Sequence, residues 1–240
     1  MTTPAALQAH ELTVDFGAKR ALNGLCLTVP AGCIYALLGG NGAGKTTTLS
    51  VFLGFVRPTS GKVQVGGQLI GENSDAARNR ISYLPENVAL YSYLSGVENL
   101  RYFSALAGLR LSALEAASRL TQAGLQVDAH DQRVQRYSKG MRQKVGLAIA
   151  YAKGAVAMLL DEPTSGLDPA ATNDFSIQLR RAAQDGLGIL MATHDLFNAV
   201  QVADRIGIMR SGRLMEEFDA HCVSHAELEA TYLAHTRGTS

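Results

Sequence analysis

The chain has no tryptophan, only three cysteines and no apolar run long enough to cross a membrane. Its longest strongly apolar stretches, 33–38 and 155–160, are far shorter than the roughly 20 residues of a membrane-spanning helix. The cysteines Cys26, Cys33 and Cys222 are odd in number and form no C-x-x-C pair, so neither a disulfide framework nor a zinc site is predicted. The start of the chain also lacks a secretory signal, so we expect it to stay in the cytoplasm.

An excess of charge of either sign is also missing, since 22 Lys and Arg face 21 Asp and Glu for a net charge of +1. This balance argues against a nucleic-acid partner. With 47% hydrophobic residues among 240, the composition is that of a folded globular chain. Aromatics make up only 6%, whereas there are 24 glycines, so we expect aliphatic packing and close backbone contacts.

The first third of the chain is strand-like. Apolar and polar residues alternate over 62–65, and Gly66-Gly67 supplies the two positive-φ positions of a tight hairpin that returns through 68–70. An apolar strand at 33–38 leads through a glycine loop into a helix, which a glycine and a proline end. This order of strand, loop and helix is typical of phosphate-binding folds.

Helical periodicity begins near residue 97 and continues to about 152. Its two apolar stripes consist of Val97, Leu100, Phe103, Ala107, Val145, Ala148, Ile149 and Ala152. Strand-like runs then return at 156–160, 189–192 and 206–209, separated by helical stretches, which predicts a parallel sheet. The pattern as a whole predicts an α/β domain that carries a helical lobe.

The glycine loop fits the pattern G-x-x-x-x-G-K-[ST] in the required place between strand and helix. Its residues are Gly39, Gly40, Asn41, Gly42, Ala43, Gly44, Lys45 and Thr46. Glycines let backbone N–H groups approach phosphate oxygens, and the helix dipole favours the anion. Lys45 would add a charge at the β and γ phosphates, and the Thr46 hydroxyl would ligate Mg²⁺. A glycine turn that merely caps a helix does not explain Lys45 and Thr46.

A second polar site follows the apolar run at 156–160, where Asp161 and Glu162 are adjacent. Successive strand residues point to opposite sides, so the two carboxylates cannot do the same work. One can hold Mg²⁺ while the other acts as a general base toward water. Taken alone, the pair could equally be two solvated acids at the start of a loop.

A third motif, Tyr137-Ser138-Lys139-Gly140-Met141, resembles the signature L-S-G-G-Q of ABC transporters. The motifs stand in that family's order, and from about Leu7 to Glu217 the chain resembles the nucleotide-binding subunit of such a transporter. The resemblance implies ATP and Mg²⁺ as cofactors. It also implies that the Ser138 helix start is a second anion clamp, for which a plain N-cap serine is the alternative.

The resemblance further implies roles for single residues: Glu162 as catalytic base, His194 as sensor of the γ-phosphate, Phe16 stacking on adenine, and Ser165 to Asp168 meeting a partner subunit. The nucleotide would be contacted by Phe16, Gly39, Asn41, Gly42, Ala43, Gly44, Lys45, Thr46, Thr47, Glu86, Ser138, Gly140 and Asp168. The metal would be held by Thr46, Glu86 and Asp161. A structural role remains the alternative for His194, and core packing for Phe16.

Several positions depart from the family's pattern. Glu86 stands where a glutamine is usual, Lys139 and Met141 replace glycine and glutamine of the signature, and Gly40 replaces a proline. With these substitutions, the motifs resemble those of the bacterial exporter branch of the family, in which the ATPase and the membrane permease are separate chains.

The fold expected from the resemblance is a RecA-like P-loop NTPase, with a parallel sheet core, a small antiparallel β subdomain and an inserted helical subdomain. One nucleotide-binding domain would span 1–240. The core with the β subdomain would take 1–86 and 155–220, the helical subdomain 87–154, and a C-terminal helix 221–240.

The function that follows is ATP hydrolysis by a head-to-tail homodimer around two Mg-ATP, driving export through an integral-membrane permease. The subunit would lie peripherally on the cytoplasmic face of the inner (plasma) membrane and contact the permease through 86–95. The alternatives are a soluble ABC ATPase acting on ribosomes or DNA, and a P-loop kinase. Separately, His221, Cys222 and His225 have a spacing that could hold a metal.

Overall fold

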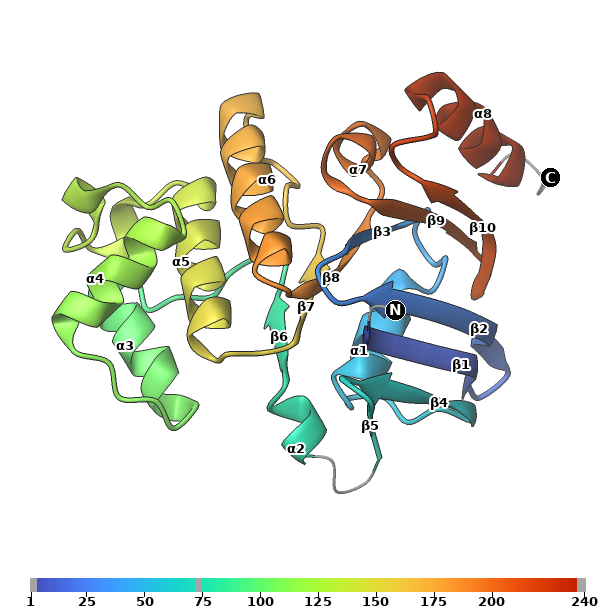
Figure 1. Cartoon of the computed structure of the whole chain (residues 1–240), viewed down its shortest axis with the longest axis horizontal. Coiled ribbons are helices and arrows are strands. Elements are labelled where there is room, and N and C mark those ends of the chain that lie inside the picture. The colour runs from blue at the N-terminus through green and yellow to red at the C-terminus, as the bar shows by residue number, and fades with distance from the viewer. Residues whose placement is uncertain (1–3, 72–74, 237–240) are drawn as a thin grey trace.

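The computed structural model describes residues 4–71 and 75–236, which form two sheets and a lobe of helices (Figure 1). The strands are β1 (Ala5–Phe16), β2 (Lys19–Pro30), β3 (Ile34–Leu38), β4 (Ser60–Val65), β5 (Gln68–Leu69), β6 (Ile81–Leu84), β7 (Ala157–Asp161), β8 (Gly188–Thr193), β9 (Arg205–Arg210) and β10 (Arg213–Asp219). The helices are α1 (Lys45–Phe52), α2 (Asp75–Arg78), α3 (Gly96–Leu106), α4 (Ala113–Gln122), α5 (Lys139–Ala152), α6 (Pro169–Gln184), α7 (Leu196–Val202) and α8 (His225–Thr236), with 3-10 turns η1 (Val127–Ala129) and η2 (Val134–Arg136).

The antiparallel sheet has the strand order β2-β1-β4-β5. Its β4–β5 hairpin was predicted correctly, because Gly66 and Gly67 both adopt positive φ, at 53° and 78°. The two 12-residue strands β1 and β2 pair with several register shifts, and Glu11 in β1 has a φ of 46°. These irregularities interrupt the alternation of buried and exposed side chains along β1. The full length of this strand therefore cannot be recognised from the sequence pattern.

The second sheet has the order β10-β9-β3-β8-β7-β6, in which only β10 is antiparallel to its neighbour. The three predicted strands are confirmed as β7, β8 and β9. All five residues of β3 are buried, and alternate side chains enter two different cores. Ile34, Ala36 and Leu38 pack against the helices, whereas Tyr35 and Leu37 face the antiparallel sheet. Burial on both faces explains why this strand reads as a continuous apolar run.

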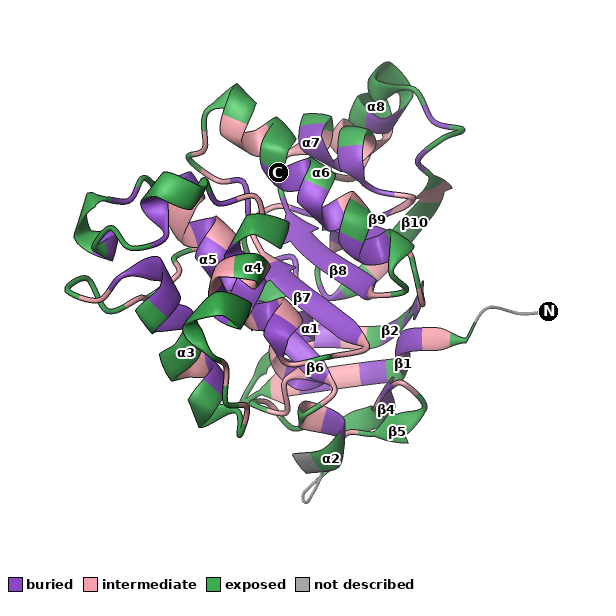
Figure 2. Ribbon diagram, turned by 60° about the vertical axis from the view of Figure 1, so that its left-hand side comes forward, coloured by how far each residue is buried: buried purple, intermediate pink, exposed green. Residues whose placement is uncertain are grey.

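The helical lobe consists of α3, α4 and α5, which lie together beside the sheet (Figures 1 and 2). Its first two helices begin with complete capping boxes, Ser95 with Glu98 and Ser112 with Glu115. One predicted core position is wrong. Ala107 is the exposed C-cap of α3, so the buried face of this helix ends one turn earlier, at Ser104.

The C-terminal part adds α7, the β9–β10 pair and α8. Asp168 caps α6, and Pro169 is the first residue of this helix. The Ser224 hydroxyl accepts the Glu227 N–H before α8. The last four residues of the predicted C-terminal helix, 237–240, lie outside the described residues, and the domain boundaries given above remain predictions. Among the described residues, no helix is both long and apolar enough to span a bilayer.

The contact between the two sheets predicts a sharp cost for one added methyl group. A Cβ at Gly188 would lie 2.2 Å from the Ala6 Cβ and 3.0 Å from the Pro30 carbonyl oxygen. We expect Gly188→Ala to lower the free energy of unfolding by about 1–3 kcal/mol, because neither neighbour can rotate away. Urea unfolding measures this change. Gly71→Ala is the control, since nothing lies within 4 Å of its added Cβ, and equal midpoints for the two variants would contradict the packing described.

Candidate functional site

The glycine loop joins the carboxyl end of β3 to the first turn of α1. Gly42 and Gly44 adopt positive φ, at 79° and 111°. A Cβ at Gly44 would come within 2.9 Å of the Ala21 carbonyl oxygen, so a glycine is required there for space as well as for conformation. No side chain caps α1. The N–H groups of its first turn are therefore available to an anion.

The loop lines a cavity of about 360 Å³ at this edge of the sheet. The predicted residues that line it are Phe16, Gly40, Asn41, Gly42, Ala43, Gly44, Lys45, Thr46, Thr47, Glu86, Asp161 and Glu162. They come from the last residue of β1, the loop before α1 and the first turn of that helix, and the segments at or just after the ends of β6 and β7. The structure thus brings together residues that are more than 140 positions apart in the sequence.

Lys45 is the buried cation of the cavity, with only 7% of its surface exposed. Its ammonium donates to the Gly39 carbonyl oxygen at 2.5 Å and lies 3.9 Å from a Glu162 carboxylate oxygen. Burial lowers the pKa of Lys45, and the negative charges of Glu162 and Asp161 oppose that change. Gly39 itself does not line the cavity, and its carbonyl instead fixes the lysine.

The two adjacent carboxylates differ in their surroundings, as their alternation along the chain requires. Burial and the charge of Glu162 raise the pKa of Asp161 above its ordinary value. Glu162 has a φ of 45°, a strained conformation for a residue with a side chain. Its carboxylate accepts hydrogen bonds from the Thr193 hydroxyl at 3.0 Å and the His194 backbone N–H at 3.4 Å.

His194 and Phe16, for which a structural role and core packing were the alternatives, both lie outside the core. The His194 side chain is 63% exposed, and its Nδ1 lies 2.8 Å from a Glu162 oxygen. Phe16 is 53% exposed at the mouth of the cavity, so core packing does not explain it. Both positions suit contact with a ligand.

Besides Gly39, the predicted nucleotide contacts Ser138, Gly140 and Asp168 do not line this cavity. The predicted γ-phosphate sensor His194 does not line it either. Ser138 is exposed and caps α5 by accepting the Met141 N–H at 3.2 Å. Asp168 caps α6 by accepting the Ala171 N–H at 2.8 Å. Within one chain, the cavity and the signature are therefore separate.

The donors present fit magnesium if a phosphate supplies further oxygens. The Thr46 hydroxyl and the Asp161 carboxylate are hard oxygen donors on the cavity wall, and Mg²⁺ commonly combines one or two carboxylates with substrate phosphates. Over 4–71 and 75–236, no group of three or more His, Cys, Asp or Glu side chains is arranged to hold a metal. The Glu86 carboxylate accepts a hydrogen bond from the Ser165 hydroxyl at 3.1 Å.

The structure does not bring the C-terminal residues of the second metal hypothesis together as a set of ligands. No such group of metal ligands is found in the described part of the chain, which includes His221, Cys222 and His225. His221 instead lies 3.6 Å from an Asp204 oxygen, and the ring of His225 lies 6.0 Å from that of Phe197.

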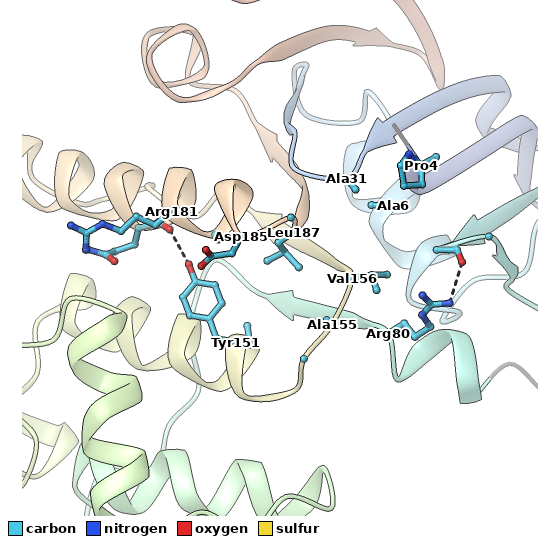
Figure 3. A pocket seen from close by; sticks show the side chains of 18 of the residues that line it. Pro4, Ala6, Ala31, Arg80, Tyr151, Ala155, Val156, Arg181, Asp185 and Leu187 are labelled. Atoms are coloured by element: carbon cyan, nitrogen blue, oxygen red, sulfur yellow. Dashed lines mark hydrogen bonds between the residues drawn. The ribbon is translucent and has the colours of Figure 1, made fainter. Parts of the chain in front are cut away.

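A larger groove of about 1160 Å³ lies elsewhere, where β7 and β8 begin (Figure 3). Beside it, Arg80 donates to the Gly66 carbonyl oxygen, and the Tyr151 hydroxyl donates to that of Gln178. Ligands of open α/β sheets bind beyond the carboxyl ends of the strands. The smaller cavity is therefore the candidate site, despite its size.

Sequence reasoning missed some residues of the site. Lys19 and Ala21 line the cavity at the start of β2, and only the pairing of β1 with β2 places them there. Thr193 was not predicted as a site residue, yet its hydroxyl donates a hydrogen bond to the Glu162 carboxylate. Its position at the end of an apolar strand, next to His194, is the signal that could have identified it.

Fold and site together define a P-loop ATPase, with the two carboxylates Asp161 and Glu162 at the carboxyl end of β7. The sequence pattern described as ABC transporter matches residues 22–165, which is more than half of the chain. The chain therefore belongs to the ABC transporter family.

Curated relatives are ATP-binding proteins with transport or resistance names. The chain is 35% identical over 213 residues to the daunorubicin/doxorubicin resistance ATP-binding protein DrrA of Streptomyces peucetius, covering 88% of this chain and 64% of that protein. It is 31% identical to the linearmycin resistance protein LnrL of Bacillus subtilis, with 87% and 68% covered. It is also 35% identical to the bacitracin transport protein BcrA of Enterococcus faecalis, with 88% and 68% covered. The chain thus spans about two thirds of these relatives' length.

Solved structures agree on the fold. An ATP-binding subunit of an ABC transporter superposes with a TM-score of 0.81 at 28% identity, covering 95% of this chain and 99% of that one. The dimeric ATP-binding cassette MJ0796 bound to ADP and Pi gives 0.78 at 23% identity, covering 89% and 98%. The predicted fold class is confirmed.

The environment of Asp161 predicts a gain in stability when its charge is removed. Because the pKa of Asp161 is raised in the folded chain, its ionised form opposes folding at neutral pH. We expect Asp161→Asn to raise the urea midpoint at pH 7 without nucleotide. The gain should shrink as the pH falls, since the wild-type carboxyl then also becomes neutral. The exposed Asp131→Asn is the control and should change little.

Proposed function

We propose that the chain is the ATP-hydrolysing subunit of a transporter whose membrane permease is a separate chain. The observation that carries this proposal is the cluster of Lys45, Glu162 and His194, in which one carboxylate is held by a buried cation and an exposed imidazole. A phosphate-binding loop with only a structural role would not need this arrangement.

The residues divide the work of hydrolysis. The N–H groups of the loop and the Lys45 ammonium bind the phosphates and offset their charge. Bound Mg²⁺, held by Thr46 and Asp161, would neutralise charge on the phosphate oxygens. Glu162 accepts a proton from the attacking water, and His194, hydrogen-bonded to the same carboxylate, lies on its exposed side, where a γ-phosphate would contact it.

A second copy of the chain would complete the site. Ser138 is exposed at the N-terminus of the 14-residue helix α5, and it does not line its own chain's cavity. A head-to-tail dimer would bring this helix start to the phosphates bound by the other subunit. The dimeric state of the cassette MJ0796 with ADP and Pi supports this arrangement by analogy of fold.

The permease would dock beside the helical lobe. The segment 86–95 exposes Tyr91 and Tyr93, and the Tyr91 ring packs edge-on against Tyr102 of α3. Relatives named for drug resistance and for bacitracin transport support an exporter role and a peripheral place at the cytoplasmic face of the membrane. The cargo would be set by the permease.

Removing the base should stop turnover but not binding. We expect Glu162→Gln to lower kcat for ATP by about 10²–10⁴-fold, because the amide cannot accept the proton of the attacking water. Binding of ATP should persist, and the variant should collect as a dimer in gel filtration with Mg-ATP. Phosphate release and elution volume are the two measurements.

The exposed Glu229→Gln is the matched control and should hydrolyse ATP like the wild type. Wild-type turnover by Glu162→Gln would refute the assignment of the base. A strictly monomeric variant with bound ATP would refute the composite site.

Phe16 is expected to bind the adenine ring. We expect Phe16→Ala to weaken ATP binding by about 1–3 kcal/mol, roughly 5- to 150-fold, because stacking on a base is worth that much. Stability should hardly change, since the side chain is half exposed. Calorimetric titration with Mg-ATP measures the affinity. Phe55→Ala, 75% exposed and not lining the cavity, should bind normally, and an equal loss in both variants would contradict the role.

A further inference from the structure

Three segments of the proposed machinery meet at Glu86, just after β6. Its carboxylate lies 3.8 Å from the Lys139 ammonium at the first residue of α5. The same carboxylate accepts the Ser165 hydroxyl, which belongs to the loop after β7. Its backbone oxygen accepts a hydrogen bond at 2.9 Å from the side chain of Gln143, also on α5. One residue thus joins the cavity, the signature helix and the loop before α6.

Glu86 makes two different contacts with α5, a buried hydrogen bond to Gln143 and a partly exposed ion pair with Lys139. Gln143 is buried, with 1% exposed, so its bond to the Glu86 backbone is part of the packed structure. The Lys139 and Glu86 side chains are 31% and 46% exposed. A partly exposed ion pair contributes little to folding. The Lys139–Glu86 ion pair is therefore better suited to neutralising and orienting the Glu86 carboxylate at the cavity than to stabilising the fold.

The surroundings restrict where Lys139 can lie. A Cβ at Gly166 would come 3.6 Å from the lysine Nζ and 3.9 Å from its Cδ, so the side chain runs along the backbone of this glycine. That path leads toward the carboxylate that lines the cavity. Signature and cavity are otherwise separate in one chain, and this contact is a direct electrostatic link between them.

Glu86 and Lys139 are two of the positions at which this sequence departs from the pattern it resembles. A carboxylate on the wall of a triphosphate cavity repels its ligand. A cation 3.8 Å away offsets that repulsion. The negative charge at Glu86 is therefore tolerable because Lys139 is present, and the structure brings the two departures together although they are 53 positions apart.

We infer that Lys139 and Glu86 form a positioning pair, in which Lys139 neutralises the Glu86 carboxylate at the nucleotide cavity and ties the first turn of the signature helix to it. This inference rests on the proposed function, because it assumes that the cavity binds ATP. Lys139 is a positioning residue in this scheme, since it acts on the nucleotide through Glu86.

The test is a double-mutant cycle on Mg-ATP affinity, measured by calorimetry with the full chain. We expect Lys139→Gln to weaken binding about 3- to 10-fold, because Glu86 is left uncompensated. We expect Lys139→Gln to have little effect once Glu86 is already neutral, so the double variant should bind Mg-ATP within about twofold of Glu86→Gln alone. A merely structural role would shift the urea midpoints of the single variants together with their affinities.

Lys144→Gln is the matched control, because this lysine is on the same helix but pairs with Asp174 at 3.3 Å. It should leave the affinity unchanged, and urea midpoints of all the variants should agree. Independent losses, with a double variant weaker than either single one, would overturn the pair while leaving the proposed function intact. Failure of the wild-type chain to bind Mg-ATP would overturn both.

Discussion

The structure depends on how a buried ammonium is satisfied at the end of a buried strand. Lys45 is nearly inaccessible to water, and a charge in such a place needs partners. It finds them in the Gly39 carbonyl and the Glu162 carboxylate, which come from two different strand ends. The order of the parallel sheet, with β8 between β3 and β7, brings these ends to one edge. The positions of the cavity, of Glu162 and of the exposed His194 all depend on that arrangement.

The site holds Glu162 rigidly, but the signature serine Ser138 lies away from the cavity. Glu162 is held by a strained backbone and three polar contacts, so its carboxylate has a fixed direction. Ser138, in contrast, is solvent-exposed at a helix start away from the cavity. Such a separation is what the proposed head-to-tail dimer requires, because in that proposal ligand binding favours the association of two chains.

Glu86 occupies the junction of these halves. It lines the cavity, contacts the first residue of α5 and receives the hydroxyl of the loop that follows β7. These contacts join the three segments through one side chain. The helical lobe is thus connected to the core by more than packing.

The sequence by itself determined the glycine loop, the carboxylate pair, the hairpin at Gly66 and the alternation of strands and helices. Each of these is local, because glycine geometry, side-chain period and capping act over a few residues. Tertiary structure alone decided that Phe16 is exposed at the cavity, that Ala107 lies outside the core and that Glu86 meets Lys139. Those outcomes depend on which distant segments the sheet order places side by side, and no local pattern encodes that order.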